Sequence, residues 1–258
     1  MKKPDLFSRR VLPLAAAALL GLSACSEEPP PVHEGYEAAS LEELAALLAE
    51  LPQNTAEDPW RIRLKDLNLG NLGGAEDGLE PLFRTFQGRY VSLDLDACTG
   101  ATIGWGSSAA QSTANRPDKD KLISLILPAG AERVGYRNFE NAGSLKSVGF
   151  PQFLRTIGNA AFAGCASLVR VDLPETLQHI EDRGFAGCVN LQTLIVRAQN
   201  PPGLGRGPYS PPLPVGADPG VFSGVPENFT IIVPLGQEDA YKTASGWSFY
   251  ASCIRSEP

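Results

Sequence analysis

The sequence predicts an α/β solenoid of about four to five coils, with a ladder of parallel strands and a cap at each end. Two observations predict it. One kind of residue recurs every 23 positions in each of four slots, and the units 145–167 and 168–190 agree at 9 of 23 positions. The slots are Leu122, Leu145, Leu168 and Leu191; Pro128, Pro151 and Pro174; Phe139, Phe162 and Phe185; and Val134, Ile157 and Ile180. A fixed period of this length indicates stacked units that share one core.

The first half of unit 168–190 reads as a strand. Leu168, Val171 and Leu173 should face inward, while Arg170 and Asp172 should face outward, because side chains alternate along a strand. The same alternation in the other units would place one row of outward side chains along the ladder.

The second half of the unit should return the chain. Pro174 lacks an N–H group and ends the strand. Leu177 and Ile180 form a second apolar pair, which predicts a short second strand. Phe185 and Cys188 lie three positions apart, which suits a helical turn with one face inward.

Residues 145–168 carry the motif L-x-x-V-x-L-P-x-x-L-x-x-I-x-x-x-A-F-x-x-C-x-x-L almost in full. This motif resembles that of the BspA-like leucine-rich-repeat family of bacterial surface proteins, and the resemblance covers roughly residues 60–254. It implies a leucine-rich-repeat solenoid and adhesion to host matrix. Two departures, Ala142 for Cys and Gly184 for Ala, exchange small residues and should not disturb the fold.

The two ends of the solenoid depart from the repeat. Residues 88–100 resemble the first coil of such proteins, with a longer polar insertion over 101–121. The unit from Leu191 keeps only its first strand, and the Pro- and Gly-rich segment 197–224 predicts a long loop. Residues 229–234 and 239–251 resemble the closing strand and helix of the family.

Residues 40–89 should cover the first coil as an N-terminal cap. Ser40 and Glu43 form a capping-box pattern at the start of a helix over 41–51. Residues 60–64 alternate like a strand, and residues 79–86 suit a second helix.

The N-terminus predicts export and a lipid anchor. A basic segment and the short apolar run 11–22 form a signal peptide, and Leu22-Ser23-Ala24-Cys25 resembles a lipobox in which Cys25 is acylated. Cleavage after Ala24 by an ordinary peptidase is the alternative, and Arg9-Arg10 leaves the Sec and twin-arginine routes both open. An acylated Cys25 would hold the protein on a bacterial membrane, at the outer membrane or cell surface.

The expected organisation has five parts. These are a signal peptide (1–24), a flexible tether with Glu and Pro residues (25–39), the N-terminal cap (40–89), the solenoid (90–200), and a loop with the C-terminal cap (201–258).

The charge excludes one class of partner. Residues 1–24 hold four of the 22 basic residues and one of the 29 acidic residues, so the mature chain carries a net charge of −10. An acidic chain with dispersed charge has no electrostatic attraction for nucleic acid.

Catalysis, a metal and a cofactor are not expected. The two histidines, His33 and His179, lie far apart, and neither a C-x-x-C pair nor a G-x-S-x-G motif is present. The glycines of 203–207 follow two prolines and open no helix, so they do not form a phosphate loop. The chain is therefore interpreted as non-enzymatic.

The cysteines allow two interpretations. Cys165 and Cys188 lie one period apart, so adjacent coils should place them close enough for a disulfide. Their shared inward slot holds Ala142 in the previous coil, which favours buried free thiols. Cys98 and Cys253 lie outside the repeat phase and are expected to be unpaired.

Two surfaces are candidates for recognition. The first is the outward strand face, and the second is the loop 203–220 with Tyr209. The ordinary alternatives are a solvated sheet face and a flexible loop. Apolar Ile126 and Ile195 at outward positions favour a partner or a cap on the strand face. The candidate residues, after Ser92 and Asp94 of the first coil, are Ser124, Ile126, Ser147, Gly149, Arg170, Asp172, Thr193 and Ile195.

The function expected from these features is a cell-surface binding or adhesion module for host or envelope proteins or glycans. The alternative is a structural cell-envelope component without a host ligand. An exported hydrolase is the least favoured interpretation.

Overall fold

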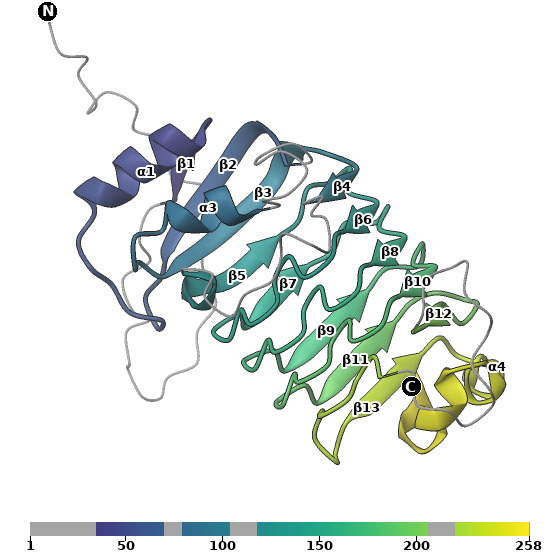
Figure 1. The fold of residues 1–258 in the computed structure, drawn as a ribbon. Coiled ribbons are helices and arrows are strands. Elements are labelled where there is room, and N and C mark those ends of the chain that lie inside the picture. The colour runs from purple at the N-terminus through teal and green to yellow at the C-terminus, as the bar shows by residue number, and fades with distance from the viewer. Residues whose placement is uncertain (1–34, 70–78, 104–117, 206–219, 258) are drawn as a thin grey trace, which may run out of the picture.

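The computed structural model describes residues 35–69, 79–103, 118–205 and 220–257. The long strands lie side by side in one row that runs from the N-terminal helix to the C-terminal helices (Figure 1). Successive units add one coil each, so the chain is the parallel leucine-rich-repeat solenoid that the 23-residue period predicts.

The long strands form two sheets. In the first, the strand order is β1-β2-β3-β5-β7, and in the second it is β14-β13-β11-β9, with every pair parallel. The bounds of the first sheet are β1 (Tyr36–Ala38), β2 (Trp60–Asn68), β3 (Val91–Thr99), β5 (Leu122–Ile126) and β7 (Ser147–Gly149). Those of the second are β9 (Arg170–Leu173), β11 (Thr193–Val196), β13 (Thr230–Val233) and β14 (Ile254–Ser256). The ladder thus divides between β7 and β9, which the repeat did not predict.

The short second strands form an uninterrupted ladder on the other side of the coils (Figure 1). Residues 23 positions apart pair directly in the middle of this ladder, as Thr156 does with Arg133 and His179. The prediction of a short second strand in each coil is confirmed. The strands are β4 (Thr102–Ile103), β6 (Arg133–Val134), β8 (Thr156–Ile157), β10 (His179–Ile180) and β12 (Gly203–Leu204).

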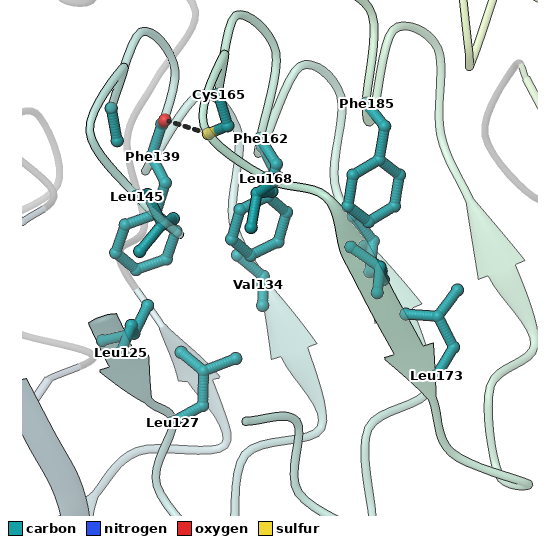
Figure 2. Packing of buried hydrophobic residues seen from close by; sticks show 14 of the residues in the cluster. Leu125, Leu127, Val134, Phe139, Leu145, Phe162, Cys165, Leu168, Leu173 and Phe185 are labelled. Carbon is teal, nitrogen blue, oxygen red and sulfur yellow. Dashed lines mark hydrogen bonds between the residues drawn. The ribbon is translucent and has the colours of Figure 1, made fainter. Parts of the chain in front are cut away.

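A phenylalanine ladder fills the space between the two strand ladders (Figure 2). The ring of Phe162 stacks on Phe139 at a centroid distance of 5.2 Å and on Phe185 at 5.5 Å. All three rings are buried, as are the leucines of the first slot. Stacked apolar side chains of successive coils therefore form one continuous core.

The turns that carry the phenylalanines do not continue into helices. They are hydrogen-bonded turns, and the N–H of Phe162 donates to the carbonyl of Gly184 in the next coil. Two positions of each turn have left-handed φ: Arg137, Ala160 and Arg183 (52°, 52° and 58°), and Asn141, Gly164 and Gly187 (61°, 72° and 72°). These residues limit each segment to a single turn. The N–H of Cys188 donates to the carbonyl of Phe185 at 3.4 Å and both side chains are buried, as expected from their spacing, but no helix follows.

The coil that starts at Leu191 continues the repeat, contrary to the sequence-based expectation. Its second strand is β12, within the segment interpreted as a long loop, and Phe222 stacks on Phe185 at 6.0 Å. Phe222 follows Phe185 by 37 positions rather than 23, so fourteen additional residues hide the period. Residues 206–219 lie outside the described part of the chain. The strand at 229–234 is followed by one more parallel strand, β14.

The N-terminal cap begins earlier than expected. Tyr36–Ala38, assigned to the tether, forms β1 and pairs with β2. The helix α1 (Leu41–Glu50) has the predicted capping box: the N–H of Glu43 donates to Ser40 Oγ at 3.0 Å, and the N–H of Ala39 donates to Glu43 Oε2 at 2.8 Å. The second helix is shorter than predicted, α3 (Glu80–Arg84).

The C-terminal cap consists of α4 (Glu238–Thr243) and the 3₁₀ segment η3 (Trp247–Cys253), which pack beside β13 and β14 (Figure 1). A second short 3₁₀ segment, η2 (Lys119–Lys121), precedes β5. Tyr241 Oη donates to the carbonyl of Ala198 at 2.7 Å, and Trp247 Nε1 donates to that of Pro202 at 2.6 Å. These bonds hold the last turn of the solenoid against the cap. Among the described residues, none of the helices has the length and apolar character that a membrane span requires.

Phe150 lies at the division between β7 and β9. It occupies the slot that Leu127, Leu173 and Val196 fill in other coils, and its ring contacts Phe162 edge-to-face at 5.6 Å. The three aliphatic residues are buried, whereas Phe150 is only partly buried. An aromatic ring therefore stands in a slot that aliphatic side chains fill elsewhere, which makes its size the first candidate cause of the division.

Candidate functional site

The outward side chains of the long strands form two columns. Strand register places Ser92, Ser124 and Ser147 side by side in the first sheet, and Arg170, Thr193 and Thr230 in the second. The other column contains Asp94, Ile126 and Gly149 in the first sheet, and Asp172, Ile195 and Ile232 in the second. The predicted row therefore exists within each sheet, but the division between β7 and β9 interrupts it.

The candidate residues differ in their exposure. Ile126 is 47% exposed, and Ser147, Gly149 and Arg170 are also exposed. Ser124, Asp172 and Thr193 are partly buried. The accessible part of this surface is thus centred on β5, β7 and β9.

Ile195 was expected to face outward against a partner or a cap, and it is not open to a partner. Its side chain is 5% exposed. In the strand register it lies between Asp172 and Ile232. Arg197 comes two positions later in the chain and so lies on the same face of the sheet. Flanking side chains on the same face shield it, so Ile195 belongs to the packing of the second sheet rather than to an open contact surface.

The two carboxylates of the strand face are already paired. Asp94 lies 3.7 Å from Arg63, and Asp172 accepts two hydrogen bonds of 2.7 Å from Arg197. The hydrogen bond with Asp172 raises the pKa of the Arg197 guanidinium. A bidentate pair of this kind fixes the geometry of both side chains. Arg170, in contrast, forms no ion pair with any residue that the structure describes.

Exposed Ile126 and Gly149 lie next to each other in register, and the partly buried side chains of Val148 and Phe150 are close by in the chain. The equivalents of Val148 in neighbouring coils, Leu125 and Val171, are each 1% exposed. Val148 and Phe150 of β7 are therefore more accessible than their equivalents, and Arg170 lies on β9, the first strand after the division.

The cysteines that the structure describes are free thiols. Cys165 and Cys188 are fully buried, and each Sγ donates to the carbonyl of a phenylalanine in the preceding coil at 3.2 Å. Figure 2 shows the bond from Cys165 to Phe139. Burial raises the pKa of Cys188 to about 12 and that of Cys165 well above its usual value. These thiols are packing residues of the core.

His179 is part of the short-strand ladder. It pairs in register with Thr156 and Gly203, and its Nε2 lies 3.2 Å from the carbonyl oxygen of Gly205. Gly203 and Leu204, the start of the glycine-rich segment and of the candidate loop 203–220, form β12. Within the described ranges, no three His, Cys, Asp or Glu side chains gather in a way that could hold a metal ion.

Several candidate residues lie outside the described part of the chain. These are Cys25 and His33 near the N-terminus and Tyr209 in the loop 203–220. Acylation of Cys25 and a contact role for Tyr209 stay predictions.

One surface feature was missed from the sequence. A groove of about 510 Å³ lies between the turns of two neighbouring coils, and its lining includes Arg155, Gln178 and Asn200. The sequence signal for it is the length of the turn between the long and the short strand of a coil. His179 follows Leu173 by six positions in one coil, but Gly203 follows Val196 by seven positions in the next. The extra residue falls in the turn that carries Pro201 and Pro202.

Comparison with known proteins gives a family and two similar structures. Residues 118–200 match the family described as BspA type leucine rich repeat region, in six copies. A crystal structure of a T. pallidum leucine rich repeat protein is 20% identical with a TM-score of 0.36, over 80% of this chain and 83% of that one. A leucine-rich repeat protein from Bacteroides ovatus is 18% identical with a TM-score of 0.34, over 70% of this chain and 44% of that one.

A search of curated proteins gave no match. The chain spans less than half of the Bacteroides ovatus protein. The family match covers the coils whose slots, strands and stacked phenylalanines have been described above. Residues 118–200 of this chain are repeats of the BspA-type leucine-rich-repeat family.

Proposed function

We propose that this protein is a lipid-anchored binding module that recognises protein or glycan partners with the strand face of its solenoid. Repeats of this family are typical of binding modules rather than enzymes, because stacked coils present an extended surface. The anchor would be the acylated Cys25, and adhesion at the bacterial surface is the role that we infer.

The observation that carries this proposal is the state of Arg170. Its guanidinium is exposed and has no ion-pair partner among the described residues, whereas Asp94 and Asp172 of the same face are paired. Ser147 and Thr193 on the flanking strands offer hydroxyl groups, and Ile126 offers an exposed apolar contact. Arginine with nearby apolar surface is a frequent anchor of protein interfaces.

A binding experiment tests the strand face. The purified protein without its leader is titrated against fibronectin, fibrinogen, laminin and collagen and against a glycan array. Arg170→Ala should weaken any measured affinity at least about tenfold, because an anchoring arginine is lost. Arg61→Ala, at the N-terminal end of the same column, removes the same charge and should change the affinity little. Equal losses for both variants would indicate unspecific charge attraction, and no loss would move the site elsewhere.

Cell fractionation tests the anchor. Cys25→Ala should block maturation or release the protein into the soluble fraction, because the acyl chains that hold it would be absent. Cys253→Ser changes a cysteine in the C-terminal cap and should leave the membrane fraction unchanged. A Cys25→Ala protein that loses its leader and stays fully membrane-bound would contradict the anchor.

Surface proteolysis separates adhesion from the structural alternative. If the protein faces the outside, protease added to intact cells should remove it. Resistance until the envelope is breached would favour a structural envelope component.

A further inference from the structure

We propose that the groove between the turns 175–178 and 198–202, here called the proline groove, binds a neutral saccharide of one or two rings. It lies at the turns that follow β9 and β11, apart from the outward strand face, and it does not depend on the function proposed above. Its lining residues are Arg155, Glu175, Thr176, Leu177, Gln178, Ala198, Gln199, Asn200, Pro201 and Pro202.

The walls of the proline groove are fixed before any ligand binds. One wall is held by Thr176, whose Oγ1 donates to the carbonyl of Leu154 at 2.8 Å. The other is held by the two bonds from the C-terminal cap, Tyr241 to Ala198 and Trp247 to Pro202. A volume of about 510 Å³ lies within the ~300–1,000 Å³ range of small-ligand sites. A rigid groove loses little conformational entropy on binding, which favours small ligands with few contacts.

Three amide side chains in the groove are available to a ligand. Gln178, Gln199 and Asn200 are exposed, and none of them makes a side-chain hydrogen bond with another described residue. An amide side chain both donates and accepts, as a sugar hydroxyl does. The apolar lining from Leu177 and the two prolines offers contact to the C–H groups of a sugar ring.

The charge of the groove favours a neutral ligand. Its lining has one cation, Arg155, and one anion, Glu175, and the Arg155 guanidinium lies 3.7 Å from the carboxylate of Glu132. An acidic or basic ligand would therefore meet no excess of opposite charge.

Several main-chain groups of the groove are already hydrogen-bonded, which leaves no continuous row of free groups for an extended peptide. Peptides that add to a sheet use free main-chain groups. Here the N–H of Gln178 donates to Arg155, and the N–H of Gly203 donates to Gln178. The carbonyls of Ala198 and Pro202 accept from the cap, and neither proline has an N–H group. The three side-chain amides therefore supply much of the hydrogen-bonding capacity of the groove, which suits a saccharide.

The test uses the protein without its leader and four neutral disaccharides: lactose, maltose, cellobiose and N,N′-diacetylchitobiose. Saturation-transfer NMR detects binding and calorimetry measures it. Gln178→Ala and Asn200→Ala should each weaken the binding of the best probe about three- to tenfold, the worth of one hydrogen bond. Gln192→Ala, an exposed glutamine on the strand ladder outside the groove, should leave it unchanged.

Two further variants distinguish the proline groove from the strand face. Gln199→Trp should abolish binding by filling the groove, while Arg170→Ala should not affect it, so the strand face and the groove fail independently. Unchanged thermal unfolding of the variants shows that they fold. The proposal is overturned if none of the four probes binds, if Gln178→Ala and Asn200→Ala bind normally, or if glucosamine and glucuronic acid bind equally well. Binding of selected peptides, lost in the same variants without any sugar binding, would also overturn it.

Discussion

The ring of His179 lies directly over Gly203 of the next coil. A Cβ atom at Gly203 would come within 2.2 Å of His179 Nδ1, and His179 Nε2 is 3.2 Å from the carbonyl oxygen of Gly205. At the end of the short-strand ladder, β12 therefore has a glycine at the position where the imidazole of β10 packs against its backbone. This packing joins β12 to β10 where the turn is one residue longer.

Gly203→Ala should destabilise the protein by about 1–3 kcal/mol, because the new methyl group overpacks the contact with His179. Urea unfolding followed by circular dichroism measures the change. Gly130→Ala is the matched control, since a Cβ there meets nothing within 4 Å. In the background His179→Ala the cost of Gly203→Ala should largely disappear, which a double-mutant cycle reports as coupling. Additive costs would show that the two residues do not constrain each other.

Phe162 is the central ring of the phenylalanine ladder, between Phe139 and Phe185. Phe162→Ala should cost about 3–5 kcal/mol, because it leaves a cavity that rigid neighbouring coils cannot fill. Phe153→Ala removes a ring that is 53% exposed and should change the free energy of unfolding by less than about 0.5 kcal/mol. Similar costs for the two variants would mean that the ladder is not a shared core.

Phe150→Leu should restore pairing between β7 and β9, because leucine fits the slot that Leu127 and Leu173 occupy. Slower hydrogen exchange of the backbone amides of Arg170 and Asp172, which point away from β11, would show the new pairing. The converse change, Leu127→Phe, should speed exchange in β7 by separating β5 from β7. If Phe150→Leu leaves the exchange rates unchanged, another feature of β7, such as Gly149, divides the ladder.

Much of the fold could be predicted because each slot of the repeat has one physical task. The inward leucines and phenylalanines and the two strands of a coil follow from alternation and period. The coil from Leu191 could not be recognised, since fourteen additional residues place Phe222 out of phase. The division of the long-strand ladder falls at β7, where Phe150 replaces an aliphatic residue, and the period does not encode such a local change.

The turn positions with left-handed φ could not be predicted from the sequence, because only some of them hold residues that favour this backbone conformation. Asn141, Gly164 and Gly187 suit such a backbone, but Arg137 and Ala160 do not suggest one. At Gly184, a Cβ would lie 2.7 Å from Ile180 Cγ2, although Ala occupies the matching position in the preceding coil. Small differences in coil geometry decide such positions, and they appear only in the packed structure.

The sequence predicted which side chains of the strand face point outward, but not which of them are exposed to solvent. Strand alternation placed Arg170 and Ile126 outward, and both are exposed. Alternation does not reveal that Arg197 would pair with Asp172 or that Ile195 would be shielded, since both depend on neighbouring side chains. The proline groove depends on a one-residue change of turn length, which is visible in the sequence only after the coils have been aligned.

Cys188 should make the protein less stable as the pH rises above about 9. Burial raises the pKa of its thiol from 9.0 to about 12, so the folded state keeps the proton over a range in which the unfolded state releases it. The unfolded state then binds fewer protons, and the free energy of unfolding falls by up to ~1.4 kcal/mol per pH unit for this group. Below pH 9 the thiol is protonated in both states, and its contribution is fully present.

Cys188→Ala tests this linkage without disturbing the core, because Ala142 already fills the same slot two coils earlier and is buried. Urea unfolding between pH 8.5 and 10.5 should show a shallower loss of stability in the variant than in the wild-type protein. Cys253→Ser is the control, since that cysteine is only partly buried and should leave the slope unchanged. Cys165, whose pKa is also raised by burial, keeps a residual slope in the variant. Identical slopes for the wild-type protein and Cys188→Ala would mean that this thiol ionises as easily in the folded chain as in the unfolded one.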